Sequence, residues 1–409
     1  MRITTALFSA LLFSAAQAQE TVTVSLTPGS AEQLWYSLTD GTQGHTALAG
    51  WDLAFEINGG SNAAVLVNTA GQDHVYQSPY TVAQWDALDT NGLADSWVEL
   101  QNSDTTWSVG ALNQNLNGPF DLGWGVYNMA THVVAGDSIF VVKLSNGDWK
   151  KLRVDGLSSG TYTFTYADLD GGMEQTGSIT KSNYPGKNFA YWSMTTNAAI
   201  DREPVSSSWD LLFTKYYTDL GIMWYSVTGV LQNKGVEVAQ VGGVPPSEAS
   251  PDGAVYSTDI HTIGHDWKNY SFSAGAYVVS DTLTYFVKDV HSNLWKVVFT
   301  AFTSSTGDFT FTKELVGHTG ITEQAAAGQV VVYPNPVSNG QAQLVLDVPA
   351  TQADVLVYDL SGKQVISTRF GGLTPLTVRS MDVSALTAGT YVLRVQHAQG
   401  AIISKLIVQ

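Results

Sequence analysis

The chain has 409 residues, no cysteine, and a formal net charge of −17 from 19 basic and 36 acidic residues. Without cysteine it has no disulfides, thiol chemistry, iron–sulfur clusters or acylated N-terminal cysteine. Its negative charge argues against nucleic-acid partners and electrostatic membrane binding, because both surfaces are anionic.

The first 18 residues have the pattern of a secretory signal peptide. Met1 and Arg2 form a short basic start, residues 6–16 are mostly apolar, and Ala16-Gln17-Ala18 is a small-x-small cleavage site. We expect cleavage after Ala18. The apolar stretch is shorter than the roughly 20 residues that a membrane-spanning helix needs, and no later stretch approaches that length, so we expect no transmembrane segment.

An internal duplication follows. Four landmarks recur in the same order, at residues 34–38, 50–55, 124–154 and 160–169 and again at 191–194, 208–213, 267–300 and 307–315. Three tryptophans within two of these landmarks are offset by 158, 143 and 146 residues (209 − 51, 267 − 124 and 295 − 149). A repeat of this length indicates a duplicated domain with loop insertions. We therefore predict repeat 1 at 19–172, a linker at 173–186, repeat 2 at 187–316, and a second linker at 317–328.

Both repeats have the period-two pattern of β-strands. In TYTFTYADL, Tyr162, Phe164 and Tyr166 share one face and threonines the other. Asn146-Gly147 is a strong hairpin signal, and no stretch beyond the signal peptide sustains a helical apolar period. The predicted fold class is all-β, with two tandem antiparallel β-domains followed by a small immunoglobulin-like sandwich.

The repeated blocks resemble a known family. The aromatic-Tyr-Ser-Leu strand, the WDLAF and WDLLF strands, and the late hairpins with Lys-Leu or Lys-Val resemble the HmuY-like secreted haem-binding proteins of Bacteroidota over residues 30–315. The resemblance implies that one haem is held between two axial side chains and passed to an outer-membrane receptor. Haem is the only cofactor that this interpretation allows.

Candidate iron ligands lie in repeat 1. His74 in GQDHVY and His132 in MATHVV offer imidazole nitrogens, and Met129 offers a softer thioether. The alternative is that both histidines are ordinary surface residues. The position in repeat 2 that matches His132 falls near Ala276, so we expect no second haem site.

Catalytic signatures are weak. His261 and His265 have i, i+4 spacing, but the intervening residues do not favour a helix, so a loop is expected. Asp52 and Asp210 follow the repeated tryptophans, where ordering a backbone turn explains them better than acid catalysis. We predict that the protein is not an enzyme.

The aromatic residues allow a glycan-binding interpretation. We expect four tryptophans at duplicated positions to be core residues: Trp51, Trp149, Trp209 and Trp295. Trp85, Trp97 and Trp107 instead lie in a polar insertion at residues 77–120 that repeat 2 lacks. A glycan surface would be sought there.

The last eighty residues carry separated motifs in a fixed order: VVVYPNPVSNG, VLVYDLSGKQV and GTYVLRV, followed by a terminal strand. They resemble the type A C-terminal sorting domain of the Bacteroidota type IX secretion system, over residues 329–409. The resemblance implies a partner, the type IX translocon, and a route through the periplasm to the cell surface or medium. The residues that carry it are Tyr333, Pro334, Asn335, Pro336, Asp359, Gly362, Gly389, Thr390, Tyr391 and Lys405.

The sequence thus predicts a secreted or cell-surface β-protein without enzymatic activity that binds a ligand, for which haem is the candidate. Two alternatives remain open: a structural or adhesive protein without a small-molecule ligand, and a carbohydrate-binding protein. A hydrolase on a β scaffold is the third class.

Overall fold

The computed structural model describes residues 19–58, 63–93, 95–318, 329–347, 351–360, 362–374, 377–397 and 400–409. Antiparallel strand pairing dominates these residues, which confirms the all-β prediction. Their helices are five short 3-10 segments: η1 (Thr69–Gly71), η2 (Val82–Ala87), η3 (Ala111–Asn113), η4 (Lys181–Asn183) and η5 (Ser206–Ser208). None of the helices in these ranges is long and apolar enough to cross a membrane. The signal peptide, its cleavage site and residues 319–328 of the second predicted linker lie outside the described residues.

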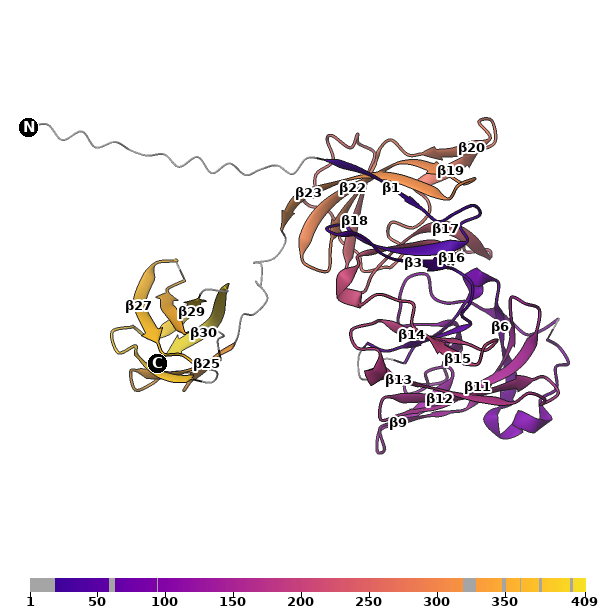
Figure 1. The fold of residues 1–409 in the computed structure, drawn as a ribbon, viewed down its shortest axis with the longest axis horizontal. Coiled ribbons are helices and arrows are strands. Elements are labelled where there is room, and N and C mark those ends of the chain that lie inside the picture. The colour runs from indigo at the N-terminus through magenta and orange to yellow at the C-terminus, as the bar shows by residue number, and fades with distance from the viewer. Residues whose placement is uncertain are drawn as a thin grey trace, which may run out of the picture. The chain divides into compact units, whose positions relative to one another are not determined.

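The chain divides into two compact units, residues 1–319 and 320–409. The first unit contains two β-sandwich lobes, each with its own core (Figure 1). We call them lobe 1, which contains strands β4 to β15, and lobe 2, which contains β1 to β3 together with β16 to β23.

Lobe 1 pairs a larger sheet of order β13-β12-β11-β10-β6-β7, to which β8 and β9 attach, with a smaller sheet of order β15-β14-β4-β5. Phe55, Phe164 and Trp192 meet between the two sheets. The strands are β4 (Leu53–Glu56), β5 (Val65–Val67), β6 (His74–Thr81), β7 (Glu99–Leu100), β8 (Gly125–Asn128), β9 (Val133–Gly136), β10 (Ser138–Lys143), β11 (Trp149–Ser158), β12 (Thr161–Asp168), β13 (Gln175–Thr180), β14 (Phe189–Ser193) and β15 (Ala198–Ile200).

Lobe 2 has the corresponding arrangement. Its sheets have the orders β1-β23-β22-β21-β18 and β17-β16-β2-β3, with the separate hairpin β19-β20. Tyr36, Phe213 and Phe311 meet in its core. The strands are β1 (Glu20–Ser25), β2 (Glu32–Ser37), β3 (Gly41–Ala47), β16 (Leu211–Asp219), β17 (Trp224–Gln232), β18 (Glu237–Gly242), β19 (Lys268–Ser271), β20 (Ala276–Val279), β21 (Leu283–Lys288), β22 (Asn293–Thr303) and β23 (Asp308–His318).

The two sequence repeats exchange strands between the lobes. In repeat 1, β2 pairs with β16 of repeat 2, and in repeat 2, β14 pairs with β4 of repeat 1. In lobe 2, β1 of repeat 1 pairs with β23 at the edge of the larger sheet. In lobe 1, β13 occupies the equivalent edge beside β12. Figure 1 shows the indigo strands β1 and β3 among the later strands of lobe 2. Each lobe is therefore completed by the other repeat.

This exchange changes the predicted domain organisation. The expected linker at 173–186 is largely structured, because it contains β13 and η4. The other predicted linker begins within β23, which runs to His318. Repeat boundaries in the sequence and lobe boundaries in the structure do not coincide.

The second unit is a small β-sandwich with sheets of order β24-β25-β28 and β27-β26-β29-β30. Leu344, Val355 and Leu393 are fully buried between them. The strands are β24 (Gln329–Tyr333), β25 (Gln341–Asp347), β26 (Gln352–Tyr358), β27 (Gln364–Gly371), β28 (Thr377–Asp382), β29 (Gly389–His397) and β30 (Gly400–Val408).

Candidate functional site

An apolar pocket lies beside the β8-β9 hairpin of lobe 1. Its volume is about 480 Å³, which falls in the range of small-molecule sites. The lining residues are Pro119, Phe120, Leu122, Tyr127, His132, Val134, Leu157, Ser159 and Gly160. We call it the hairpin pocket.

Tyr127 and His132 are the two lining residues of this pocket whose rings carry polar atoms. The phenol oxygen of Tyr127 lies 2.7 Å from Nδ1 of His132, which is hydrogen-bonding distance. The ring of Tyr127 packs against the lobe 1 core, whereas His132 is exposed. If Nδ1 donates its proton to the phenol oxygen, the lone pair of Nε2 is available to a metal.

The hairpin turn holds His132 in an unusual backbone conformation. Its φ is +55°, in the left-handed region, where residues other than glycine, asparagine, aspartate and histidine are uncommon. Asn128 fixes the turn, because its Oδ1 accepts hydrogen bonds from the backbone N–H groups of Ala130 and Thr131.

The matching hairpin of lobe 2 fills the same position with glycine. Both turns have four residues, 129–132 and 272–275, between paired four-residue strands. The counterpart of His132 is therefore Gly275, with φ +62°, next to Ala276, near which the sequence places it. Repeat 1 thus places an imidazole where repeat 2 uses the residue that the backbone favours.

The structure does not bring His74 and His132 together. In β10, Lys143 pairs with His74 on one side and with Trp149 of β11 on the other, so His74 lies at the level of Trp149. Val134, which is close to His132, pairs with Leu157 further along β11. Those two positions are eight residues apart (157 − 149) along the strand, which at about 3.3 Å per residue is roughly 26 Å. The two imidazoles cannot bind one iron atom in this structure.

The other predicted ligands have simpler surroundings. The Nδ1 atom of His74 lies 2.7 Å from a carboxylate oxygen of Glu99, in a partly exposed pair. Met129 lies in the same turn as His132 and is 63% exposed. Of the predicted ligands, only His132 lines a pocket with apolar walls.

The histidine pair at 261 and 265 does not form a metal site. Nδ1 of His261 lies 2.7 Å from the backbone carbonyl oxygen of Asp104, and Nδ1 of His265 lies 3.5 Å from the phenol of Tyr216. In the described ranges, no group of three or more metal-binding side chains comes together. The residues from 261 to 265 form turns and an isolated bridge, in agreement with the loop prediction.

The repeated aspartates anchor the exchanged strands. A carboxylate oxygen of Asp210 accepts a hydrogen bond from the backbone N–H of Leu38, and Asp52 accepts one from the backbone N–H of Met194. Burial is the main cause that raises the pKa of Asp210 to about 6. These contacts agree with the backbone-ordering role.

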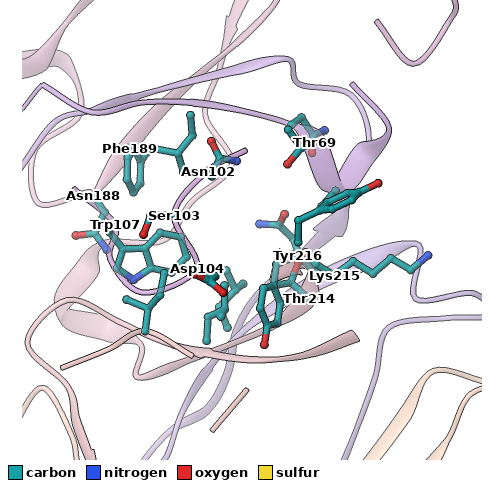
Figure 2. A pocket seen from close by; sticks show the side chains of 18 of the residues that line it. Thr69, Asn102, Ser103, Asp104, Trp107, Asn188, Phe189, Thr214, Lys215 and Tyr216 are labelled. Carbon is teal, nitrogen blue, oxygen red and sulfur yellow. Dashed lines mark hydrogen bonds between the residues drawn. The ribbon is translucent and has the colours of Figure 1, made fainter. Parts of the chain in front are cut away.

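A second cavity, the interlobe cleft, lies between the outer faces of the two four-stranded sheets (Figure 2). Trp107 packs against the aromatic clusters on both faces, and its indole N–H donates to the backbone oxygen of Gln232 at 2.8 Å. Figure 2 shows Trp107 and Phe189 on one side of the cleft and Tyr216 and Lys215 on the other.

The other two tryptophans of the insertion, Trp85 and Trp97, do not share a surface with Trp107, as a common glycan site would require. Trp85 is buried between lobe 1 side chains, with Lys151 and Arg153 over its ring. Trp97 lines a separate shallow pocket with Val98. The sequence therefore located one cleft residue, Trp107, but could not reveal that the repeated Trp51 and Trp209 line the same cavity.

The sorting motif docks onto the last strand of the second unit. The side chain of Asn335 donates to the backbone oxygen of Lys405 and accepts from the N–H of Ile407, both at 2.8 Å. Asp359 and Gly362 form the turn after β26, where Gly362 has φ +84°.

The Gly389-Thr390-Tyr391 segment opens β29 and pairs with the end of β30. Its tyrosine hydroxyl donates to the backbone oxygen of Thr387 at 2.7 Å. The separated motifs thus meet around one pair of strands.

Comparison with known proteins decides the role of this unit. Residues 331–409 match the secretion system C-terminal sorting domain. The protein carries a type IX secretion sorting domain at these residues. It is exported to the cell surface or the extracellular space, as the sequence predicts.

The other comparisons concern the chain as a whole. No curated protein matches the chain. Among the solved structures, the crystal structure of dimeric latent PorU from Porphyromonas gingivalis is 10% identical, with a TM-score of 0.16. The match covers 85% of this chain and 31% of that chain. A likeness at this TM-score carries no argument, and the HmuY-like resemblance over residues 30–315 is not supported.

Proposed function

We propose that this protein is a secreted, non-enzymatic binding protein whose hairpin pocket takes up a flat, largely apolar ligand with a metal centre. Haem is the biological molecule that fits this description best. The proposal rests on the pocket itself, without support from a family.

The observation that carries it is the left-handed backbone of His132. A left-handed residue with a Cβ atom costs roughly 1–2 kcal/mol relative to a right-handed one, and Gly275 shows that the same turn forms with glycine. A function for the imidazole would explain why this strained position holds His132 and not glycine. The imidazole lines an apolar pocket and has a phenol oxygen to orient it.

The chemistry follows from the two side chains. The phenol oxygen of Tyr127 would accept a hydrogen bond from Nδ1–H and fix the imidazole ring, so that Nε2 of His132 would hold the iron. Phe120, Val134 and Leu157 would supply apolar contacts to the macrocycle. The carboxylates of haem would stay in solvent, because the net charge of −17 disfavours burying further negative charge.

Absorbance titration of the chain with haemin tests the proposal. The wild-type chain should give a saturable, shifted Soret band, and His132→Gly should lose it without losing stability, since that variant copies the turn of lobe 2. Tyr270→Phe removes the phenol at the matching position of lobe 2 and should behave as wild type. An unshifted band with wild-type protein would refute haem binding.

An adhesive role is the second candidate, and one surface favours it. The β19-β20 hairpin exposes a cluster of aromatic rings, in which Phe272 is 92% exposed and contacts Tyr270. Tyr277 extends the cluster toward the lobe. Loss of cell adhesion in Phe272→Ser, with haemin binding unchanged, would separate this role from the first.

A further inference from the structure

The interlobe cleft contains buried polar atoms that have no partner. The indole N–H groups of Trp51 and Trp209 and the side-chain oxygen of Asn188 form no hydrogen bond. These residues are 8%, 2% and 1% exposed, and all three line the cleft. A buried polar atom left unpaired costs about 1–3 kcal/mol, so three in one cavity indicate that something else supplies partners.

Other tryptophans of the first unit provide an internal comparison. Six of them donate their indole N–H to an acceptor within the chain: Trp85, Trp107, Trp124, Trp192, Trp267 and Trp295. Trp51 and Trp209 occupy equivalent positions in the two repeats, each directly before an aspartate that anchors an exchanged strand. The same atom is thus left unpaired at both equivalent positions, and both face one cavity.

The surroundings favour a ligand with hydroxyl groups on a carbon ring. Eight of the 27 lining residues are aromatic, among them Trp35, Trp107 and Phe189. Indole N–H groups donate and an amide oxygen accepts, and a hydroxyl group can satisfy either because it both accepts and donates. Aromatic rings also pack against the C–H faces of such a ring.

The charge and the volume of the interlobe cleft limit which ligands it can bind. Glu203 lines the cleft and is buried, and the chain carries a net charge of −17, so an anionic ligand is disfavoured. The cavity volume is about 90 Å³, well below the roughly 300–1,000 Å³ of pockets that enclose a whole small molecule. Such a cavity admits the hydroxyl-bearing edge of one sugar ring, with the remainder outside it.

We infer that the interlobe cleft binds a neutral sugar residue, with Trp51 and Trp209 as hydrogen-bond donors and Asn188 as acceptor. The site lies between lobes that each depend on both repeats, so strand exchange places its two halves opposite one another. It shares no residue with the hairpin pocket, and each proposal can fail without the other.

Saturation-transfer NMR of the chain tests this site, with glucose, galactose, mannose and N-acetylglucosamine as probes. At least one should give a saturable signal. The signal should fall at least tenfold in Trp51→Phe/Trp209→Phe, which removes both N–H groups and keeps aromatic rings in place. Glucuronic acid, which adds a carboxylate, should give no signal.

Trp295→Phe is the matched control, because its indole N–H donates to Asp289 outside the cleft. It should bind as wild type does. Thermal unfolding verifies that each variant is folded, and Trp51→Phe alone serves if the double variant is not. No response to any neutral sugar, or an equal response in the cleft variants, would overturn the inference and leave a cleft that holds water only.

Discussion

The carboxylate of Asp210 accepts a hydrogen bond from the backbone N–H of Leu38 at 2.7 Å, across 172 residues of sequence. Its other oxygen accepts from the N–H of Val290 at 3.1 Å. One side chain of repeat 2 therefore links the end of a repeat 1 strand to the hairpin after β21. Asp52 makes the reciprocal contact with Met194, so the exchange of strands is anchored on both sides.

Removing this anchor should destabilise lobe 2. Asp210→Ala leaves two backbone N–H groups without an acceptor, and we expect a loss of about 2 kcal/mol in the free energy of unfolding. Urea unfolding followed by tryptophan fluorescence measures it. Asp281→Ala, at an exposed position, is the control and should change the free energy by less than about 0.5 kcal/mol. Equal stabilities for the two variants would contradict the anchoring role.

Strand exchange also predicts what a deletion does. Without residues 20–47, lobe 2 lacks β1 to β3, although most of its strands come from repeat 2. Amides of β16 and β23 should lose protection from hydrogen exchange, while β11 and β12 in lobe 1 stay protected. The same reasoning argues against independent folding of residues 187–316, which the repeat pattern suggests. Protected β16 and β23 amides in the deletion variant would show that lobe 2 needs no strands from repeat 1.

Stability should fall as the pH rises from about 5 to 7. Burial, followed by the nearby charge of Asp52, raises the pKa of Asp73 to about 8. In the unfolded chain an aspartate has a pKa of about 3.9. Between these two values the folded chain holds a proton that the unfolded chain has released, so the free energy of unfolding decreases with pH. One such group contributes at most about 1.4 kcal/mol per pH unit.

The variant Asp73→Asn should flatten this slope. An asparagine oxygen can still accept the hydrogen bond that the N–H of Ser145 donates to Asp73 at 2.8 Å, but the side chain no longer titrates. Unfolding by urea at pH 5, 6 and 7 gives the slopes, with Asp281→Asn as the exposed control. The same slope in Asp73→Asn and wild type would exclude Asp73 as the source.

The sorting unit predicts a defect in export. Asn335→Ala removes both hydrogen bonds to β30, which should destabilise the unit by about 1–2 kcal/mol and lower the secreted fraction. Deleting residues 329–409 should trap the chain in the periplasm. Immunoblots of periplasm and medium measure both effects, with the exposed Gln364→Ala as control. Wild-type secretion of the deletion variant would contradict the sorting role.

Local patterns predicted the strands well, because period-two alternation and turn residues act over short distances. Tyr162, Phe164 and Tyr166 are all buried on the face of β12 that the sequence indicates. Which strands pair depends on contacts such as Asp210 with Leu38, and no local pattern reveals them. In the hairpin pocket, the sequence indicated His132 as a candidate ligand. Its hydrogen-bond partner Tyr127 and its counterpart Gly275 could be recognised only from the geometry of the hairpin.

The interlobe cleft could also be predicted only in part from the sequence. Of the four tryptophans predicted as core residues, Trp51, Trp209 and Trp295 are buried, whereas Trp149 is partly buried. The unpaired N–H groups of Trp51 and Trp209 follow from the way two sheets face each other, which depends on the exchange of strands.

Resonance Raman spectroscopy of the ferrous haem complex tests the central claim most directly, because the iron–histidine stretching band reports a bond to an imidazole nitrogen. We predict this band for the wild-type chain and for His74→Ala, and its loss in His132→Gly. A band that persists in His132→Gly, or a wild-type chain that binds no haem, would contradict the assignment of His132 as the iron ligand.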